Sequence, residues 1–185
     1  MKLNRKWINE EFVDLSQVSD QEFVETMTLA GQKVETYERL DGELRNVVVG
    51  KVLSMVRHPN SDHMWICQVD VGREEPVQIV TGAQNVRDGA LVPAALHNSW
   101  LPGGVHITKG KLRGVESCGM LCSYKELGLT EHDCPEAYAD GIWILNDEGC
   151  EVGEDMNVVI GNDDSIVEFE ITNNRPDCYS LIGLA

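Results

Sequence analysis

The sequence predicts a mainly β protein with short α+β segments at its two ends. Between about residues 47 and 145, short apolar stretches rich in β-branched residues are separated by turns that contain Gly or Asn. A helix signature precedes this region, and a single strand signature follows it. Because closely spaced short strands are typical of small all-β domains, the central region is expected to form a compact barrel or sandwich.

The helix signals lie near the start of the chain. Trp7, Ile8 and Phe12 are near helical spacing, which predicts a short first helix. Residues 19–22 (SDQE) fit a capping box, in which the Ser and Glu side chains satisfy free backbone amides, and Gly31 is a natural stop. The pattern therefore predicts a second helix between them.

The central strands are identified by alternation and by the turns between them. Gly50 interrupts the first strand and indicates a bulge or a sharp bend there. A second capping box at residues 123–126 predicts a short helix that ends at Gly128. The predicted strands are 47–53, 65–71, 77–80, 91–96, 105–107, 142–145 and, after an acidic stretch, 166–171.

The charge of the chain is unevenly distributed. Its 185 residues include 15 basic and 31 acidic side chains, for a net charge of −16. Residues 47–130 hold 8 basic and 7 acidic side chains, whereas the flanks carry net charges of −4 and −13. This balance argues against a chain that coats nucleic acid by bulk charge, but a local site in the middle region remains open. Acidic flanks are also ordinary solvated surface.

The composition also indicates the compartment. No stretch approaches the ~18 apolar residues of a membrane span, and the N-terminus lacks an apolar signal region. We therefore expect a cytoplasmic protein without a membrane partner, whose six cysteines are reduced thiols. The apolar run that ends at Ala185 suggests a longer protein that has been cut there.

Metal and catalytic sites are not expected. Cys118 and Cys122 have C-x3-C spacing, whereas structural zinc usually relies on C-x2-C pairs, so buried free thiols are the better interpretation. The sequence has no nucleophile elbow, no phosphate-binding loop and no dinucleotide fingerprint. The histidines are interpreted mostly as surface residues.

A basic stripe is the strongest feature for nucleic-acid binding. Lys109, Lys111 and Arg113 alternate, so on an extended segment they would share one face and could follow a phosphate backbone. Trp100 and Tyr124 are candidate stacking partners for unpaired bases. The alternative is a solvated strand edge, where Lys discourages aggregation.

Five motifs occur in a fixed order, and together they resemble a known family. They are residues 58–62 (HPNSD), 78–86 (QIVTGAQNV), 101–104 (LPGG), 112–123 (LRGVESCGMLCS) and 126–129 (ELGL). The series resembles the tRNA-binding domain shared by several aminoacyl-tRNA synthetases and by free-standing tRNA-binding proteins. This resemblance implies an OB-fold barrel.

The flanks narrow the resemblance. Residues 6–8, 170–178 and 182–185 look like the corresponding segments of the β subunits of bacterial phenylalanyl-tRNA synthetases. This implies an OB-fold β-barrel (41–149) inserted into a discontinuous, truncated α+β domain (1–40 and 150–185). It also implies an α2β2 ligase whose α subunit makes phenylalanyl-adenylate from phenylalanine and Mg-ATP, while this chain has neither cofactor nor catalytic residues.

The tRNA site suggested by the resemblance and the charges combines cations with two polar side chains. The expected partner is tRNA rather than DNA, and the contacts are expected to be weak and salt-dependent. The hypothesised residues are Lys51, Arg57, Lys109, Lys111, Arg113 and Lys125, with Asn85 and Ser117 as hydrogen-bonding partners. Two alternatives remain: a structural insert that packs on other domains or subunits with little tRNA contact, and a free-standing tRNA-binding protein.

Overall fold

The computed structural model describes residues 1–134, 140–145 and 149–185, and it contains two compact units. One unit is formed by residues 1–41 together with 162–185, and the other by residues 42–161. The second unit is therefore inserted in the sequence of the first. Among the described residues, no helix has the length and apolar character needed to cross a membrane.

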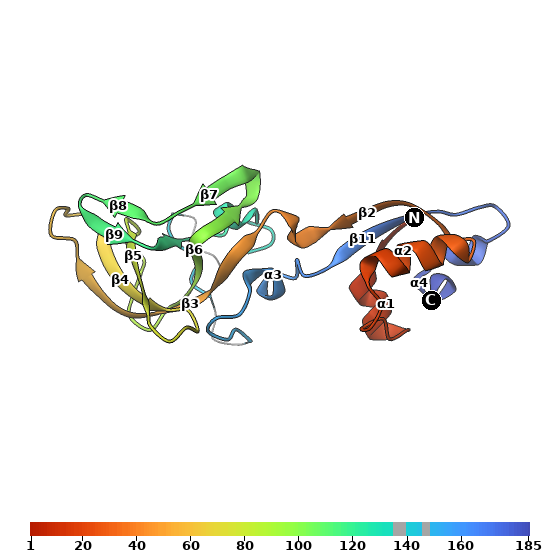
Figure 1. Ribbon diagram of the computed structural model, residues 1–185, viewed down its shortest axis with the longest axis horizontal. Helices are drawn as coiled ribbons and strands as arrows, with labels where there is room; N and C mark the ends of the chain where they lie inside the picture. The colour runs from red at the N-terminus through yellow and green to blue at the C-terminus, as the bar shows by residue number, and fades with distance from the viewer. Residues whose placement is uncertain (135–139, 146–148) are drawn as a thin grey trace. The chain divides into compact units, whose positions relative to one another are not determined.

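The inserted unit is an antiparallel β-barrel with an OB-like strand arrangement. Its sheet has the order β10-β6-β3-β4-β5, and β7 extends β6 as a hairpin (Figure 1). The backbone N–H of Cys118, just before β10, donates to Gln78 O of β5 at 2.8 Å, so the two edges of the sheet meet. The strands are β3 (Arg45–Arg57), β4 (Trp65–Asp70), β5 (Val77–Thr81), β6 (Leu91–Leu101), β7 (Val105–Ile107) and β10 (Gly119–Leu121).

Smaller elements complete this unit. A separate hairpin, β8 (Gly110–Leu112) with β9 (Val115–Ser117), lies between β7 and β10 in sequence. Three short helical turns are η2 (Pro102–Gly104), η3 (Lys125–Leu127) and α3 (Met156–Val159). The capping box at the start of η3 is confirmed, because Ser123 N and Oγ both donate to Glu126 Oε2 and Gly128 adopts a left-handed φ of 82°.

The barrel core explains the Gly in the first strand. β3 runs through Gly50 without a bulge. Its register shifts lie instead between Val52 and Ser54 against β4 and between Arg45 and Val47 against β6. A Cβ atom at Gly50 would lie 2.6 Å from Val69 Cγ1 and 3.1 Å from the Ala94 Cβ. The expected bulge at Gly50 is therefore wrong, and the residue is small because two neighbouring strands approach it closely.

The strand predicted at residues 142–145 is absent. Its backbone groups pair with three different segments: Ile142 N donates to Asn85 Oδ1, Trp143 N to Cys122 O, and Leu145 N to Leu91 O. Only the last of these belongs to an isolated β-bridge. An apolar, β-branched stretch therefore covers the barrel without joining its sheet.

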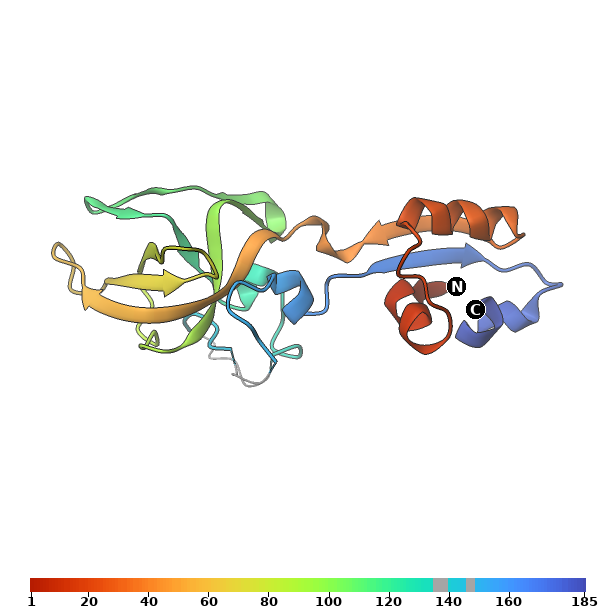
Figure 2. The ribbon, with the colours of Figure 1, turned by 60° about the horizontal axis from the view of Figure 1, so that its bottom comes forward.

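The other unit is a small α+β fold (Figure 2). Its three-stranded antiparallel sheet has the order β1-β11-β2. Both predicted helices are confirmed, and Ser19 caps the second by accepting from Glu22 N at 3.2 Å. The elements are β1 (Lys2–Asn4), α1 (Arg5–Glu11), α2 (Asp20–Leu29), β2 (Lys33–Arg39), β11 (Ser165–Glu170), η4 (Pro176–Tyr179) and α4 (Leu181–Leu184), with η1 (Leu40–Gly42) at the boundary.

The second boundary between the units differs from the sequence-based one. Residues 150–161 pack with the barrel rather than with the α+β fold. Val49 of β3 donates to Glu154 O at 2.9 Å and accepts from Gly153 N at 2.8 Å. Met156 of α3 is buried in the barrel core beside Val47 and Leu127. Val159 is also partly buried against this core, so the boundary lies near residue 161 instead of residue 150.

Candidate nucleic-acid interface

Three loops meet at one end of the barrel, and we call them the loop cluster: residues 58–64, 82–86 and 112–114. The first loop joins β3 to β4, and the third is the turn of the β8–β9 hairpin; the two lie side by side in both ribbon views (Figures 1 and 2). Gln84 Nε2 of the second loop donates to His63 O at 2.9 Å. The cluster is thus tied together by hydrogen bonds between loops that are distant in sequence.

His58 links the first loop to the hairpin turn. Its side chain is buried, with 3% of its surface exposed. Asn60 N donates to His58 Nδ1 at 3.0 Å, so Nδ1 carries no proton and the neutral ring is protonated at Nε2. His58 Nε2 lies 3.0 Å from Leu112 O, to which it therefore donates. Sequence reasoning classed the histidines as mostly surface residues and missed this role, although the HPNSD motif contained the signal.

Asn60 and Arg113 strengthen the same link. Asn60 Nδ2 donates to Arg113 O at 3.1 Å, and Arg113 Nη1 donates to Asn60 O at 3.2 Å. Arg113 has a left-handed φ of 47°, so the hairpin turns at this residue. The predicted alternating stripe therefore ends at Lys111, and the Arg113 side chain turns toward the first loop instead of continuing the row.

Arg57 reaches the loop cluster from the end of β3. Its guanidinium carbon lies 4.4 Å from the centre of the ring of Trp65, the residue of β4 that pairs with Arg57. Arg57 Nη1 also donates to Asp62 O at 2.6 Å. These contacts hold the charged group at the cluster and leave its other N–H groups without a hydrogen bond to any described residue.

The ion pairs between described residues all lie in the α+β unit. Among residues 1–134, 140–145 and 149–185, every ion pair involves a cation of that unit: Arg5, Lys6, Lys33, Arg39 or Arg175. The barrel cations, including Arg57 and Arg113, form none with the described carboxylates. A cation that lacks a carboxylate partner can neutralise a phosphate without first breaking an ion pair. The barrel cations are therefore available to a polyanion, whereas in the α+β unit only Lys2 is free of an ion pair with the described residues.

Lys51 and Lys125 do not belong to the loop cluster. Lys51 faces Asp70 and Leu91 across the sheet, and it precedes Arg57 by six residues on the same strand, about 20 Å in an extended chain. Lys125 lies in η3, with its Nζ atom 5.6 Å from the centre of the Tyr124 ring. The six hypothesised cations therefore do not form one patch.

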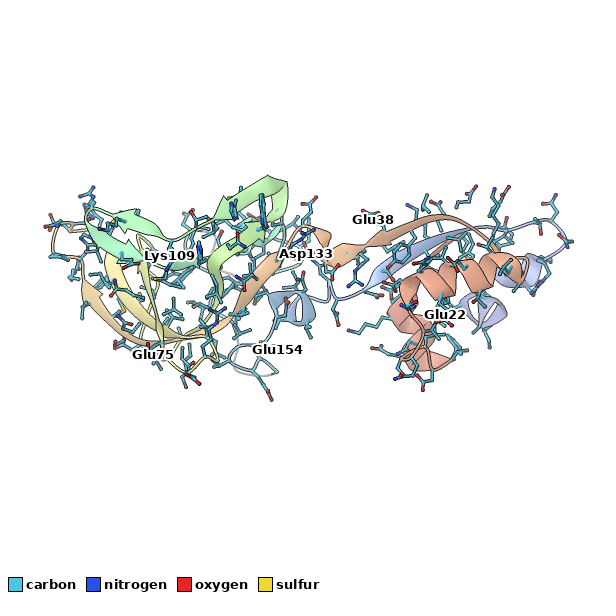
Figure 3. All side chains as sticks on the ribbon, in the orientation of Figure 1. Glu22, Glu38, Glu75, Lys109, Asp133 and Glu154 are labelled. Carbon is cyan, nitrogen blue, oxygen red and sulfur yellow. The ribbon has the colours of Figure 1, made fainter. Side chains whose placement is uncertain are left out.

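Lys109 and Lys111 precede the hairpin turn of the loop cluster but are not part of the cluster. Lys111 is exposed on β8 opposite Glu116. Lys109, labelled in Figure 3 on the barrel unit, borders a groove together with Gln68 of β4 and Gln78 of β5. Its backbone N–H donates to the Nδ1 atom of His97, which also lines the groove. The charges at the rim are mixed, since Arg73, Glu74 and Glu75 stand there too.

The two polar candidates are engaged inside the barrel. Asn85 Nδ2 donates to Ile142 O at 2.8 Å, and Asn85 Oδ1 accepts from Ile142 N at 3.1 Å. Ser117 is buried: its hydroxyl donates to Gly119 O and accepts from Val80 N. The structure thus gives both side chains internal hydrogen bonds and places neither among the exposed cations.

The two candidate stacking residues have different environments. Tyr124 is buried, with 1% of its surface exposed, so its ring is not available to a base. Trp100 is 41% exposed, and its ring stacks on His106 with the centroids 4.3 Å apart and an interplanar angle of 9°. Only Trp100 retains the exposed flat surface that stacking requires.

The thiols of Cys67 and Cys122 are buried and unreactive. Burial raises the pKa of the Cys122 thiol to about 12 and that of Cys67 to about 11. Both thiols are therefore protonated at neutral pH and are poor nucleophiles. All six cysteines are free, and the described residues contain no group of three or more His, Cys, Asp or Glu side chains placed to hold a metal ion.

Comparison with known families places this barrel in a class. A family model described as a putative tRNA binding domain matches residues 47–141, which is half of the chain and includes the loop cluster. The chain belongs to this tRNA-binding domain family.

The most informative relatives are longer proteins. Over all 185 residues the chain is 48% identical to the phenylalanine–tRNA ligase β subunit of Clostridium acetobutylicum and 44% identical to that of Clostridium tetani. Each alignment covers 100% of this chain but 22% of the relative, so the chain spans about a fifth of their length. Among solved structures, the C-terminal domain of Plasmodium vivax p43 is 22% identical, with a TM-score of 0.42 over 61% of this chain and 59% of that one.

Proposed function

We propose that the chain is a non-catalytic, tRNA-binding region of a phenylalanine–tRNA ligase β subunit, and that its barrel contacts the sugar–phosphate backbone of tRNA. The observation that carries the proposal is that the family match contains a loop cluster whose arginines have no ion pair with the described residues. The similarity to β subunits extends through both flanks of the barrel, which favours a ligase subunit over a free-standing tRNA-binding protein.

The proposal extends to the larger assembly that the relatives imply. In it, an α subunit of an α2β2 ligase carries out the Mg-ATP-dependent activation of phenylalanine in the cytoplasm. This chain would support attachment of phenylalanine to tRNA by holding the RNA, and it would bind no cofactor itself. A pull-down of the α subunit by the full β subunit, with and without the 185 residues, tests whether this region takes part in assembly.

Backbone recognition suits the charges on the barrel. Structured RNA offers phosphates and 2′-hydroxyls to side chains more readily than base edges. Each neutralised phosphate releases counterions, so the affinity must fall as salt increases. Because the barrel unit holds 9 basic and 17 acidic residues, we expect weak binding, in the range of about 10⁻⁴ to 10⁻⁶ M that is typical of contacts dominated by phosphates.

Fluorescence anisotropy of a labelled tRNA, titrated with the 185-residue chain at two salt concentrations, tests the proposal. We expect binding at low salt that weakens at high salt. The proposal is wrong if the chain does not bind at low salt, or if the affinity does not depend on salt.

A second candidate is a structural insert that packs against other parts of the ligase. The net negative charge of the barrel unit favours it, as do Leu53 and Val56 of β3, which are 50% and 58% exposed. Substitution of both by Ser separates the two functions. If the barrel is a structural insert, this variant should fail to assemble with the rest of the ligase and should keep any tRNA affinity. If the barrel binds tRNA, loss of Arg57 and Arg113 should instead lower the tRNA affinity and leave assembly intact.

A further inference from the structure

We infer that Arg57 and Arg113 act as one composite site for the RNA phosphate backbone, and that His58 is the positioning residue that holds the two halves of this site together. The inference rests on the proposed function and deepens it. It concerns two arginines that are 56 positions apart in the sequence: Arg57 ends β3, and Arg113 lies in the turn between β8 and β9.

The two guanidinium groups are held but not neutralised. Arg57 lies against the Trp65 ring and donates once, to a backbone carbonyl. Arg113 also donates once, to the backbone carbonyl of Asn60. A guanidinium group has five N–H donors in a fixed fork, so each arginine keeps several donors for a phosphate after its internal hydrogen bond is made.

The position of Arg113 relative to Arg57 depends on the link between the two loops. Arg57 immediately precedes the first loop, and Arg113 forms the hairpin turn. Three hydrogen bonds join these segments: His58 Nε2 to Leu112 O, Asn60 Nδ2 to Arg113 O, and Arg113 Nη1 to Asn60 O. Of the three, the bond from His58 is made by a buried donor, so water competes with it least.

The His58 ring also shapes the loop that carries its partner. Its Nδ1 atom accepts from Asn60 N, which fixes the backbone of residues 58–60, while its Nε2 atom reaches across to the hairpin. One neutral imidazole therefore sets both the shape of the first loop and its attachment to the turn. The two hydrogen bonds of the ring can be removed separately, because an Asn side chain offers an acceptor in place of Nδ1 and a Gln side chain offers a donor in place of Nε2.

The test compares three variants of the 185-residue chain by anisotropy with labelled tRNA. His58→Gln keeps a donor near the Nε2 position, His58→Asn keeps an acceptor near the Nδ1 position, and His58→Ala keeps neither. We expect His58→Gln to bind tRNA within about twofold of the unmodified chain, and the other two to lose about two- to fivefold, the size of an exposed charge contact. All three variants are measured well below their unfolding temperatures, so each is folded. If His58 contributed only to the stability of the fold, the three affinities would then be equal.

A second variant avoids the risk of misfolding. Arg113→Gly removes the guanidinium at a position whose φ of 47° favours Gly, so the fold is retained. We expect a loss of about two- to fivefold in affinity and a salt dependence reduced by close to one phosphate contact. Lys51→Ala, which removes the same charge from a position outside the loop cluster, is the matched control and is expected to change neither.

The outcomes are distinguishable. If the unmodified chain does not bind tRNA, the proposed function fails. If it binds but Arg113→Gly and Lys51→Ala weaken binding equally, the composite site is wrong. In the double variant His58→Ala/Arg113→Gly, the two losses should be less than additive, because His58 acts through Arg113. Full additivity would overturn the positioning role of His58.

A competition experiment separates RNA from free phosphate as the ligand. Inorganic phosphate should compete with tRNA no better than chloride at matched ionic strength; stronger competition would indicate a site for free phosphate rather than RNA.

Discussion

Arg57 and Trp65 face each other on neighbouring strands, and the guanidinium carbon of Arg57 stands 4.4 Å from the centre of the Trp65 ring. The pair lies where β3 ends and β4 begins, next to the loop that His58 ties to the hairpin turn. A cation held on an aromatic face keeps its charge while its position is restricted. This geometry holds the Arg57 charge at the loop cluster.

Replacing Trp65 by Leu should therefore affect both stability and binding. Trp65 is half-buried against the barrel core, so the loss of packing and of the cation–π contact should lower the free energy of unfolding by about 1–3 kcal/mol. The affinity for tRNA should fall less than in Arg57→Ala, since the charge remains. Urea unfolding and anisotropy measure the two effects, and an affinity loss as large as that of Arg57→Ala would show that the ring itself contacts the RNA.

The close approach at Gly50 gives a prediction about stability alone. Gly50→Ala places a Cβ atom 2.6 Å from Val69 Cγ1, and the overpacking should cost about 1–3 kcal/mol. Gly110→Ala is the matched control, because nothing lies within 4 Å of its added Cβ. Thermal unfolding should show a lower Tm for the first variant only; equal Tm values would mean that the strands around Gly50 separate without cost.

The buried Cys122 thiol predicts a loss of stability at alkaline pH. Its pKa is raised by burial from 9.0 to about 12. Below pH 9 the thiol is protonated in both the folded and the unfolded chain, so it adds no pH dependence. Between pH 9 and 12 the unfolded chain releases the proton first, and the free energy of unfolding decreases. Urea unfolding at pH 8 and pH 10 should show a smaller decrease for Cys122→Ala than for the unmodified chain; equal decreases would contradict the raised pKa.

The exposed Trp100 ring provides a prediction for base contacts. If an unpaired base stacks on it, Trp100→Phe should retain most of the affinity and Trp100→Ala should lose about 1–3 kcal/mol of binding free energy. If the barrel reads only the backbone, as the loop cluster suggests, both variants should bind like the unmodified chain. We expect the second result, since the loop cluster holds Arg57 and Arg113 at the other end of β3 from Arg45, the neighbour of Trp100.

Local signals predicted much of the fold. The N-cap at Ser19, the capping box that begins at Ser123 and the alternation in β4 depend on neighbours in sequence, and the structure confirms each of them. The Ser19 box is confirmed only in its Ser19 half, in which the hydroxyl accepts from Glu22 N. The stretch at 142–145 has the composition of a strand, but its hydrogen-bond partners come from three distant segments, which no local pattern reveals. The β8–β9 hairpin was not predicted, because its exposed β8 strand, Gly110–Leu112, has no alternation of buried and exposed residues.

The candidate site was predicted less well, for a physical reason. Residue type identified the cations, but it could not show that Arg113 leaves the alternating row through a left-handed turn. Nor could residue type show that the side chains of Ser117 and Asn85 form hydrogen bonds with backbone groups of the barrel itself. Among the described residues, the ion pairs lie in the α+β unit and the barrel cations have none, an arrangement that depends on three-dimensional proximity alone.

The most direct test of the account compares two double variants of equal charge in salt titrations of tRNA binding. Arg57→Ala/Arg113→Gly removes both guanidinium groups of the loop cluster, and Lys51→Ala/Lys125→Ala removes two cations from elsewhere on the barrel. We expect the first pair of substitutions to lower the slope of log affinity against log salt by about 1 to 2, and the second pair to leave it unchanged. Equal slopes in the two variants would contradict a localised site and would show that RNA responds only to the total charge of the barrel.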